Sequence, residues 1–102
     1  MLYQVIWDIK AKQSLKDIFL YLKEESPSAA NKVRNELLKL TSSLEKMPER
    51  FSSEYYLRDK GNEYHSVTKW SFKIVYRIKD KEVRILDIIH TRRNTAVIEG
   101  IK

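Results

Sequence analysis

A short basic run near the end of the chain, His90-Thr91-Arg92-Arg93, carries the side chains best suited to binding an anion. It directly follows a run of apolar residues, so two guanidinium groups and an imidazole would lie at the end of a strand. Arginine binds phosphate and carboxylate oxygens bidentately, which makes this cluster a candidate site for an anionic partner. The alternative is that the arginines are solvated or paired with helix acids and that His90 is a packing residue.

Two more cations, Lys73 and Arg77, alternate with apolar residues in the preceding segment. Because side chains in a strand point alternately to its two faces, Lys73, Val75 and Arg77 would share one face, and Phe72 and Tyr76 the other. The basic face could bind an anion, or its charges could simply keep that side of a sheet soluble. The apolar neighbours of Tyr76 favour a place in the core over stacking on a nucleobase.

Formal charge is concentrated in the same part of the sequence. Residues 69–93 contain eight Lys and Arg against three acids, a net charge of +5, whereas residues 1–68 have a net charge of +1. The whole chain carries +6 at pH 7. A field focused in this way suits an anionic partner better than a diffuse basic surface would.

Composition limits the other kinds of chemistry. With no cysteine and two histidines, neither a disulfide nor a Cys- or His-based metal site is expected, and two glycines cannot form a phosphate-binding loop. No nucleophile with an adjacent base stands out, so we expect no metal and no other cofactor. The 102 residues predict a single domain, residues 1–102, and the absence of a signal-peptide pattern predicts a cytoplasmic protein.

Apolar spacing predicts the elements that position these cations. Strand formers and alternation predict strands over residues 2–7, 63–68, 71–78 and 83–89. Helical spacing predicts two amphipathic helices over residues 11–24 and 27–47, with Asp8 and Ser26 as N-caps. The fold class is therefore α+β, with one strand, an antiparallel helical hairpin and three more strands in one small, mostly antiparallel sheet. The hairpin would cover one face, and the face with Lys73, Val75 and Arg77 would be partly open to solvent.

Several short motifs occur in a fixed order along the chain. They are Trp7-Asp8, Ser26-Pro27 with Ala29-Ala30, Met47-Pro48, the segment 72–78, and residues 83–89 running into His90-Thr91-Arg92-Arg93-Asn94. In order and spacing, over nearly the whole chain, this sequence resembles the ParE/RelE superfamily of toxins from type II toxin–antitoxin modules, also called plasmid stabilisation proteins. The resemblance implies the fold described above and a growth-inhibiting function.

The resemblance implies two alternative activities. RelE-like members cut mRNA on the ribosome by attack of a 2′-hydroxyl on the adjacent phosphate, which needs a base, an acid and cations. On this alternative the chain is a ribonuclease, and Lys73, Arg77, His90 and Arg93 surround the scissile phosphate. The aromatic acid/base of the family has no counterpart here, because residues 95–102 contain neither Tyr nor His.

ParE-like members are similar to poisons of DNA gyrase without a nuclease site, and a His followed closely by an Arg pair is their common ending. We therefore expect a ParE-like toxin that acts on gyrase and is not an enzyme. Its target would be bound by Lys73, Arg77, His90, Arg92 and Arg93. A third alternative is an inactive member that only binds its partner. Residues 63–67 lack the basic side chains often seen there in both groups, which leaves the target class open.

The resemblance also implies a protein partner, a small antitoxin whose C-terminal segment wraps the toxin. An acidic, amphipathic segment would find both a basic surface and apolar grooves on this chain. We expect the antitoxin to contact three apolar residues that the core does not need, Leu20, Tyr21 and Leu38. We also expect it to contact Arg84 in the basic region.

Overall fold

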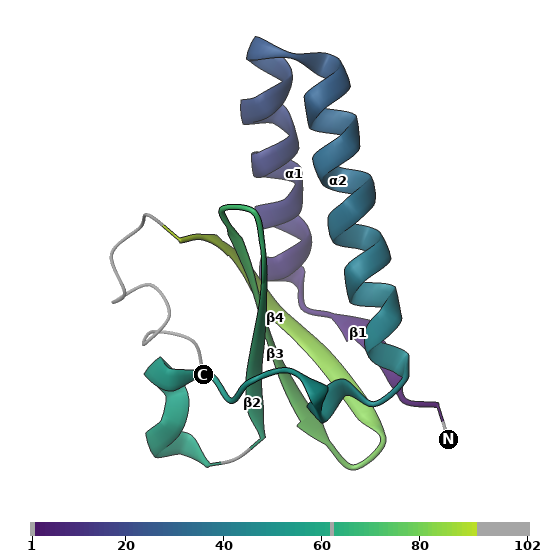
Figure 1. The fold of residues 1–102 in the computed structure, drawn as a ribbon, viewed down its shortest axis with the longest axis vertical. Helices are drawn as coiled ribbons and strands as arrows, with labels where there is room; N and C mark the ends of the chain where they lie inside the picture. The colour runs from purple at the N-terminus through teal and green to yellow at the C-terminus, as the bar shows by residue number, and fades with distance from the viewer. Residues whose placement is uncertain (1, 62, 92–102) are drawn as a thin grey trace.

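The computed structural model describes residues 2–61 and 63–91, and its elements follow the predicted order (Figure 1). Strand β1 (Gln4–Trp7) leads into helices α1 (Ile9–Glu25) and α2 (Pro27–Ser42). Three short 3₁₀ helices follow, η1 (Ser43–Glu45), η2 (Pro48–Arg50) and η3 (Tyr55–Lys60). Strands β2 (Tyr64–Lys69), β3 (Phe72–Lys79) and β4 (Glu82–His90) complete the described chain. The predicted α+β fold class is confirmed.

The two helices form a hairpin that extends away from the sheet (Figure 1). Ser26 joins them in an extended conformation, and its hydroxyl accepts a hydrogen bond from the backbone N–H of Ala29 at 3.2 Å. Pro27, which has no N–H to satisfy, follows as the first residue of α2. The structure thus confirms the predicted helix break and the predicted Ser26 cap. No helix in the described part of the chain is long and apolar enough to cross a membrane.

The four strands form one sheet in the order β1-β4-β3-β2. Strands β2, β3 and β4 are antiparallel neighbours, whereas β1 pairs with β4 in parallel. A parallel pair needs a long crossover connection, and here the connection contains the helical hairpin, the 3₁₀ helices and strands β2 and β3. The sheet is therefore mixed, with the antiparallel part made by the last three strands.

Both tight hairpin turns contain a residue with positive φ. Lys69 pairs with Phe72 and Lys79 with Glu82, so each turn has two residues. The first of them is Trp70 with φ of 53° in one turn and Asp80 with φ of 56° in the other. A short polar residue such as Asp tolerates this conformation, but for a bulky side chain it is strained. The strand connection at Trp70 therefore carries local strain.

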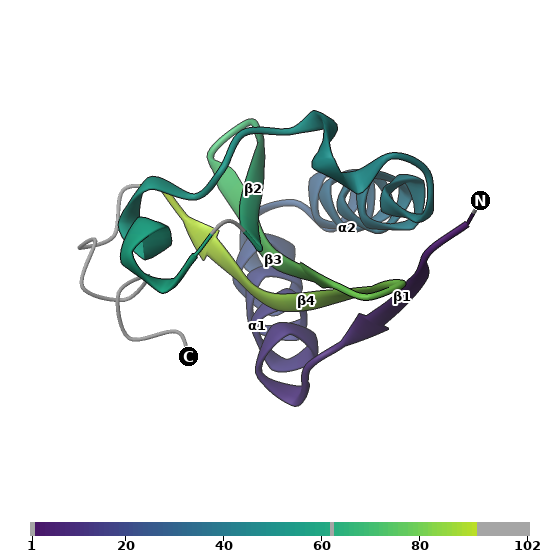
Figure 2. The same ribbon diagram turned by 90° about the horizontal axis from the view of Figure 1, so that it is seen from below.

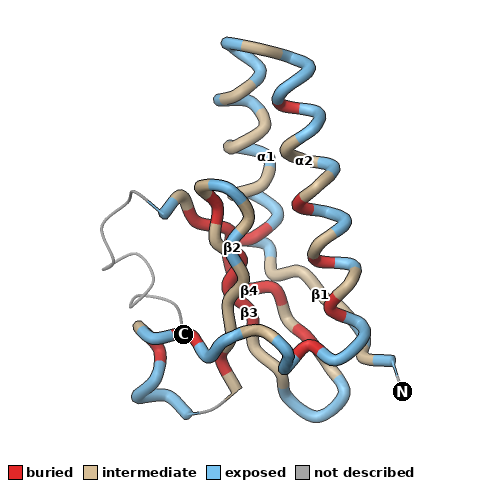
Figure 3. Tube along the Cα trace, viewed as in Figure 1, coloured by how far each residue is buried: buried red, intermediate tan, exposed pale blue. Residues whose placement is uncertain are grey.

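The main core lies between the helical hairpin and one face of the sheet. Phe72, Ile74 and Tyr76 of β3 alternate toward this face, as predicted, and all are buried. Leu37 of α2 and Ala11 of α1 are fully buried against the same cluster. Figure 3 shows the buried positions following the central strands and the inner turns of α2. The apolar stripes of the helices are thus core, as their spacing predicts.

The opposite face, which we call the second face, has a smaller core of its own. It joins Val75 of β3 and Leu86 and Ile89 of β4 to Leu57 of η3, which is fully buried. In Figure 2, η3 and α2 lie on opposite sides of strands β2 and β3. The prediction that Val75 lies on a partly open face is therefore wrong, because η3 covers it and leaves it with 0% exposure.

The chain between the helices and β2 also departs from the prediction. Met47 was expected to continue the apolar stripe of the second helix, but α2 ends at Ser42 and Met47 is 65% exposed. Its φ is 46°, a left-handed conformation that cannot continue an α-helix. Leu44, in η1, is the last buried residue of the stripe.

Candidate functional site

Four cations of the basic region belong to the second face of the sheet. Alternation along β3 places Lys73, Arg77 and Lys79 on the same face as Val75. In the register of the sheet, Arg77 lies directly beside Arg84 of β4. The structure therefore groups Lys73 and Arg77 as the sequence alternation predicts and adds Arg84 through the strand register, but it gives each of them a different environment.

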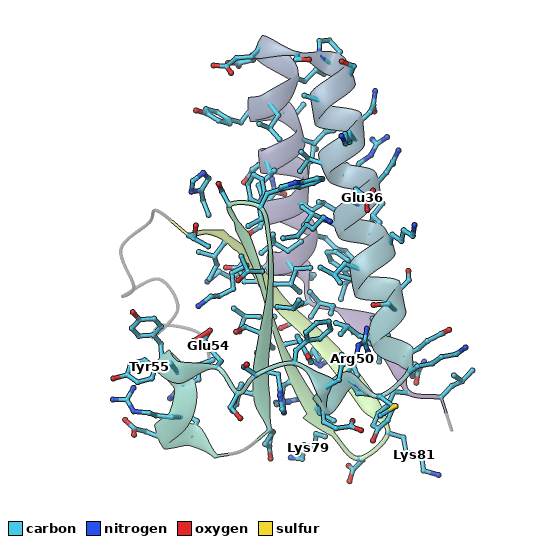
Figure 4. The ribbon with its side chains drawn as sticks, viewed as in Figure 1. Glu36, Arg50, Glu54, Tyr55, Lys79 and Lys81 are labelled. Carbon is cyan, nitrogen blue, oxygen red and sulfur yellow. The ribbon has the colours of Figure 1, made fainter. Side chains whose placement is uncertain are left out.

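Lys73 is bound to a buried acid that precedes η3. Its ammonium Nζ donates to Glu54 Oε1 at 2.9 Å, and Glu54 is 1% exposed. The other carboxylate oxygen of Glu54 accepts from the backbone N–H of Tyr56 at 2.9 Å, and the Tyr56 ring centroid lies 5.5 Å from Nζ. Charge-assisted bonds of this kind are strong when both partners are fully bonded. Glu54, labelled in Figure 4, thus neutralises Lys73 and fastens the η3 segment to β3.

Arg84 is also paired within the chain. Its Nη1 donates to Asp8 Oδ1 at 2.9 Å and its Nε to Glu82 Oε2 at 3.1 Å. These hydrogen bonds, with Asp8 the larger contributor, raise the pKa of the Arg84 guanidinium. Asp8 was predicted to cap the first helix through its side chain, which is wrong, since its side chain makes no cap bond and its carboxylate binds Arg84.

Arg77 differs from both, because it makes no ion pair with any residue that the structure describes. The side chain is half-buried, and its Nε is buried without a hydrogen-bond partner within residues 2–61 and 63–91. It lines an open pocket of about 300 Å³ beside the β3–β4 turn. The pocket is lined by Gln4, Arg77, Lys79, Asp80, Lys81 and Glu82. Figure 4 shows Lys79 and Lys81 at the turn end of the β3–β4 hairpin.

His90 lies on the other face of the sheet. It is paired with Phe72 across the strands, and the two rings meet edge to face with centroids 5.4 Å apart. Both belong to a second groove, of about 470 Å³, between α1 and the strands. The other lining residues are Ser14, Asp17, Ile18, Tyr21 and Ile88. The sheet therefore separates His90 from Lys73 and Arg77, while Arg92 and Arg93 lie outside the described residues.

The apolar residues predicted to bind an antitoxin are exposed on the helical hairpin. Leu20 and Tyr21 of α1 are 48% and 67% exposed, and Leu38 of α2 is 40% exposed. They are available for contact, whereas Arg84, the fourth predicted residue, is occupied by its two carboxylates.

Two acids that organise these surfaces were not predicted from the sequence. Glu54 binds Lys73, and Asp87 of β4, which is 3% exposed, accepts a hydrogen bond from Ser14 of α1 at 2.5 Å. Asp87 interrupts the apolar run of β4, as Arg84 also does, and this is a sign in the sequence that the strand needs polar partners. Within residues 2–61 and 63–91, no group of three or more His, Cys, Asp or Glu side chains is arranged to hold a metal ion.

A family model described as the ParE toxin of the type II toxin–antitoxin system parDE matches residues 5–95. This chain belongs to the ParE toxin family. The predicted superfamily is therefore confirmed, and the chain is a toxin of the type II toxin–antitoxin class. A comparison with curated protein sequences finds no match.

Solved structures of related toxins have the same fold. A chain of the chromosomal ParDE toxin–antitoxin system from P. aeruginosa is similar with a TM-score of 0.71 and 21% identity, covering 89% of this chain and 98% of that one. A chain of the RelBE2 toxin–antitoxin complex from Mycobacterium tuberculosis gives 0.63 and 20%, covering 88% and 92%. An arginine-to-alanine mutant of E. coli RelE in the free state gives 0.67 and 16%, covering 98% and 95%. At these identities the likeness shows the fold alone.

Proposed function

We propose that this member of the ParE toxin family stops growth by acting on DNA gyrase and not by cutting mRNA. One observation carries the choice: Lys73 and His90 lie on opposite faces of the sheet, and the ammonium group of Lys73 is held by Glu54. Cleavage by a 2′-hydroxyl needs cations, a base and an acid around one phosphate. His65, the other histidine, is paired with Tyr76 and shares the face of His90. Neither imidazole thus shares the face of Lys73, which supports a non-nuclease toxin.

Family membership supports the same choice. The matched model is that of a ParE toxin and covers residues 5–95, whereas the RelE likeness is one of fold at 16% identity. The proposed target contacts are Lys73, Arg77, His90, Arg92 and Arg93. Because Arg77 and His90 lie on opposite faces, a target that touches both must contact both faces of the sheet.

The proposal is tested by adding the purified toxin to gyrase and relaxed plasmid and following supercoiling on agarose gels. We expect inhibition that grows with toxin concentration and weakens in Arg77→Gln, because the charge of that side chain is unpaired among the residues that the structure describes. Arg58→Gln is the matched control, since Arg58 instead lies over the Tyr55 ring at 3.9 Å. Unchanged supercoiling, together with new mRNA ends mapped by primer extension on translating ribosomes, would favour the ribonuclease alternative. Expression that leaves both supercoiling and growth unaffected would favour an inactive binding module.

The proposed partner is a small antitoxin. A toxin that meets this antitoxin and gyrase would work in the cytoplasm, and we propose that location. The similar ParDE and RelBE2 structures come from toxin–antitoxin pairs. On this chain, three apolar side chains of the α1–α2 hairpin are exposed, Leu20, Tyr21 and Leu38. We expect the product of the neighbouring open reading frame to copurify with the toxin and to restore growth. Leu38→Glu should weaken copurification, while the adjacent exposed change Lys39→Glu should not. Equal copurification of both variants would remove Leu38 from the interface.

A further inference from the structure

The pocket beside the β3–β4 turn contains a charged group that the described chain does not satisfy. Arg77 Nε is buried and has no hydrogen-bond partner within the described ranges. Leaving a buried donor of a charged group unpaired is costly, and most buried polar groups in folded proteins are paired for that reason. Arg77 also lines the pocket, where the rest of its guanidinium can bind a group from outside.

Within residues 2–61 and 63–91, no acid makes an ion pair with Arg77. Arg84 lies directly opposite it across the strands, which is an unfavourable pairing of like charges. Asp8 and Glu82 both bind Arg84. Asp80 lines the same pocket from the exposed turn, where its φ is positive, and it makes no ion pair with a described residue. The fold thus stabilises one arginine of the pair and leaves the other with its charge unmatched.

Two further cations line the same pocket. Lys79 and Lys81 border it together with Arg77, and both lysines are exposed. Gln4 of β1 adds an amide, which can also donate a hydrogen bond. One bidentate guanidinium is enough for a planar carboxylate, whereas three cations suit a phosphate, which carries more charge and more acceptor oxygens.

We propose that this pocket binds a phosphate group, presented by a nucleotide or by a nucleic-acid strand, with Arg77 as the central contact. The terminal nitrogens of the guanidinium, which are not among the buried atoms, bind the phosphate oxygens. Lys79 and Lys81 add charge at the rim. This site lies at the turn end of β3 and β4, away from Glu54 and His90, and it does not depend on whether gyrase is the target.

The binding test uses the full chain labelled with ¹⁵N. Sodium phosphate is titrated against sodium chloride at constant ionic strength, and the side-chain Nε–H signal of Arg77 is followed by NMR. We expect a saturable shift of this signal with phosphate and none with chloride. Arg77→Lys keeps the charge but loses the guanidinium edge, so the phosphate affinity measured from neighbouring backbone signals should fall about tenfold. Arg58→Lys, the matched control, should bind phosphate as the parent does.

Three more ligands test which kind of molecule presents the phosphate and whether the pocket prefers phosphate to carboxylate. A nucleoside monophosphate or a short single-stranded oligonucleotide that binds more tightly than inorganic phosphate supports the site and names its ligand. Glutarate binding as tightly as phosphate would overturn it in favour of an acidic peptide. An Arg77 signal that does not respond to any phosphate ligand in the parent chain overturns it directly, whether or not the variants fold. Phosphate binding without gyrase inhibition would keep this proposal and reject the proposed target.

Discussion

The pair of Glu54 and Lys73 allows a quantitative test of how the segment before η3 is held on the sheet. Each partner can be removed separately, as Glu54→Gln and Lys73→Met, and both can be removed together. The two single changes are not equivalent, because the groups that they leave behind differ in burial. The carboxylate of Glu54 is 1% exposed, whereas the side chain of Lys73 is 20% exposed.

Removing one partner of a buried ion pair costs about 3–5 kcal/mol, since the other charge is left without compensation. Lys73→Met leaves the more buried charge and should reach that range. Glu54→Gln should cost less, about 1–3 kcal/mol, because the ammonium of Lys73 can reach water and the amide oxygen can still accept from Tyr56. Against a total stability of about 5–15 kcal/mol for a domain of this size, either change is large.

The measurement is urea unfolding at pH 7, followed by circular dichroism, for the parent, the two single variants and the double variant. We expect the double variant to be more stable than the sum of the single effects predicts, with a coupling energy of about 2 kcal/mol. Lys79→Met, an exposed lysine of the same strand, is the control and should change stability by less than about 0.5 kcal/mol. Additive single effects, or a larger loss in Glu54→Gln than in Lys73→Met, would refute the reasoning.

Three further changes test the fold. Burial raises the pKa of Tyr76, whose hydroxyl donates to the carbonyl of Pro48 at 2.6 Å, so the folded state keeps this proton when the unfolded chain loses it near pH 10. Stability should therefore fall as the pH rises above about 10, and Tyr76→Phe should weaken that dependence in urea titrations while costing about 1–3 kcal/mol at pH 7. Trp70→Gly should raise the free energy of unfolding by about 1 kcal/mol, since glycine adopts a φ of 53° without strain. A lower melting temperature for this variant would instead show that packing of the indole ring outweighs the strain. Ser26→Ala should cost about 1 kcal/mol through the lost cap, and exposed Ser42→Ala should cost less than half of that in the same melts.

Local patterns predicted the elements well, because each reports a constraint within a few residues. The Ser26-Pro27 step carries both a cap and a helix start, and the structure has both. Alternation of Phe72, Ile74 and Tyr76 predicted the buried face of β3. The parallel pairing of β1 with β4 was not predicted, because nothing within a four-residue strand specifies which partner it will find.

The charges of the site were harder to predict, because their partners are far away in sequence. Lys73 is 19 residues from Glu54, and Arg84 is 76 residues from Asp8. Asp8 satisfied the local pattern of a helix cap, yet the stronger interaction with a guanidinium defined its role. A sequence pattern shows that a cation exists but not whether the fold neutralises it. The predicted set of target contacts therefore stays a prediction for all five residues. The structure places Lys73, Arg77 and His90, and Arg92 and Arg93 lie outside the described residues.

These pairings narrow the basic surface that the sequence suggested. Residues 69–93 carry eight Lys and Arg, but Lys73 and Arg84 are matched by buried or half-buried acids. Four described cations of this region remain. Arg77, Lys79 and Lys81 share one pocket at the β3–β4 turn, whereas Lys69 lies at the β2–β3 turn with its ammonium group over the Trp70 ring. Exposed charges more than about 10 Å apart are largely screened at physiological salt, so such a cluster acts locally. An anionic partner should therefore be drawn first to this turn, not along the whole length of the last two strands.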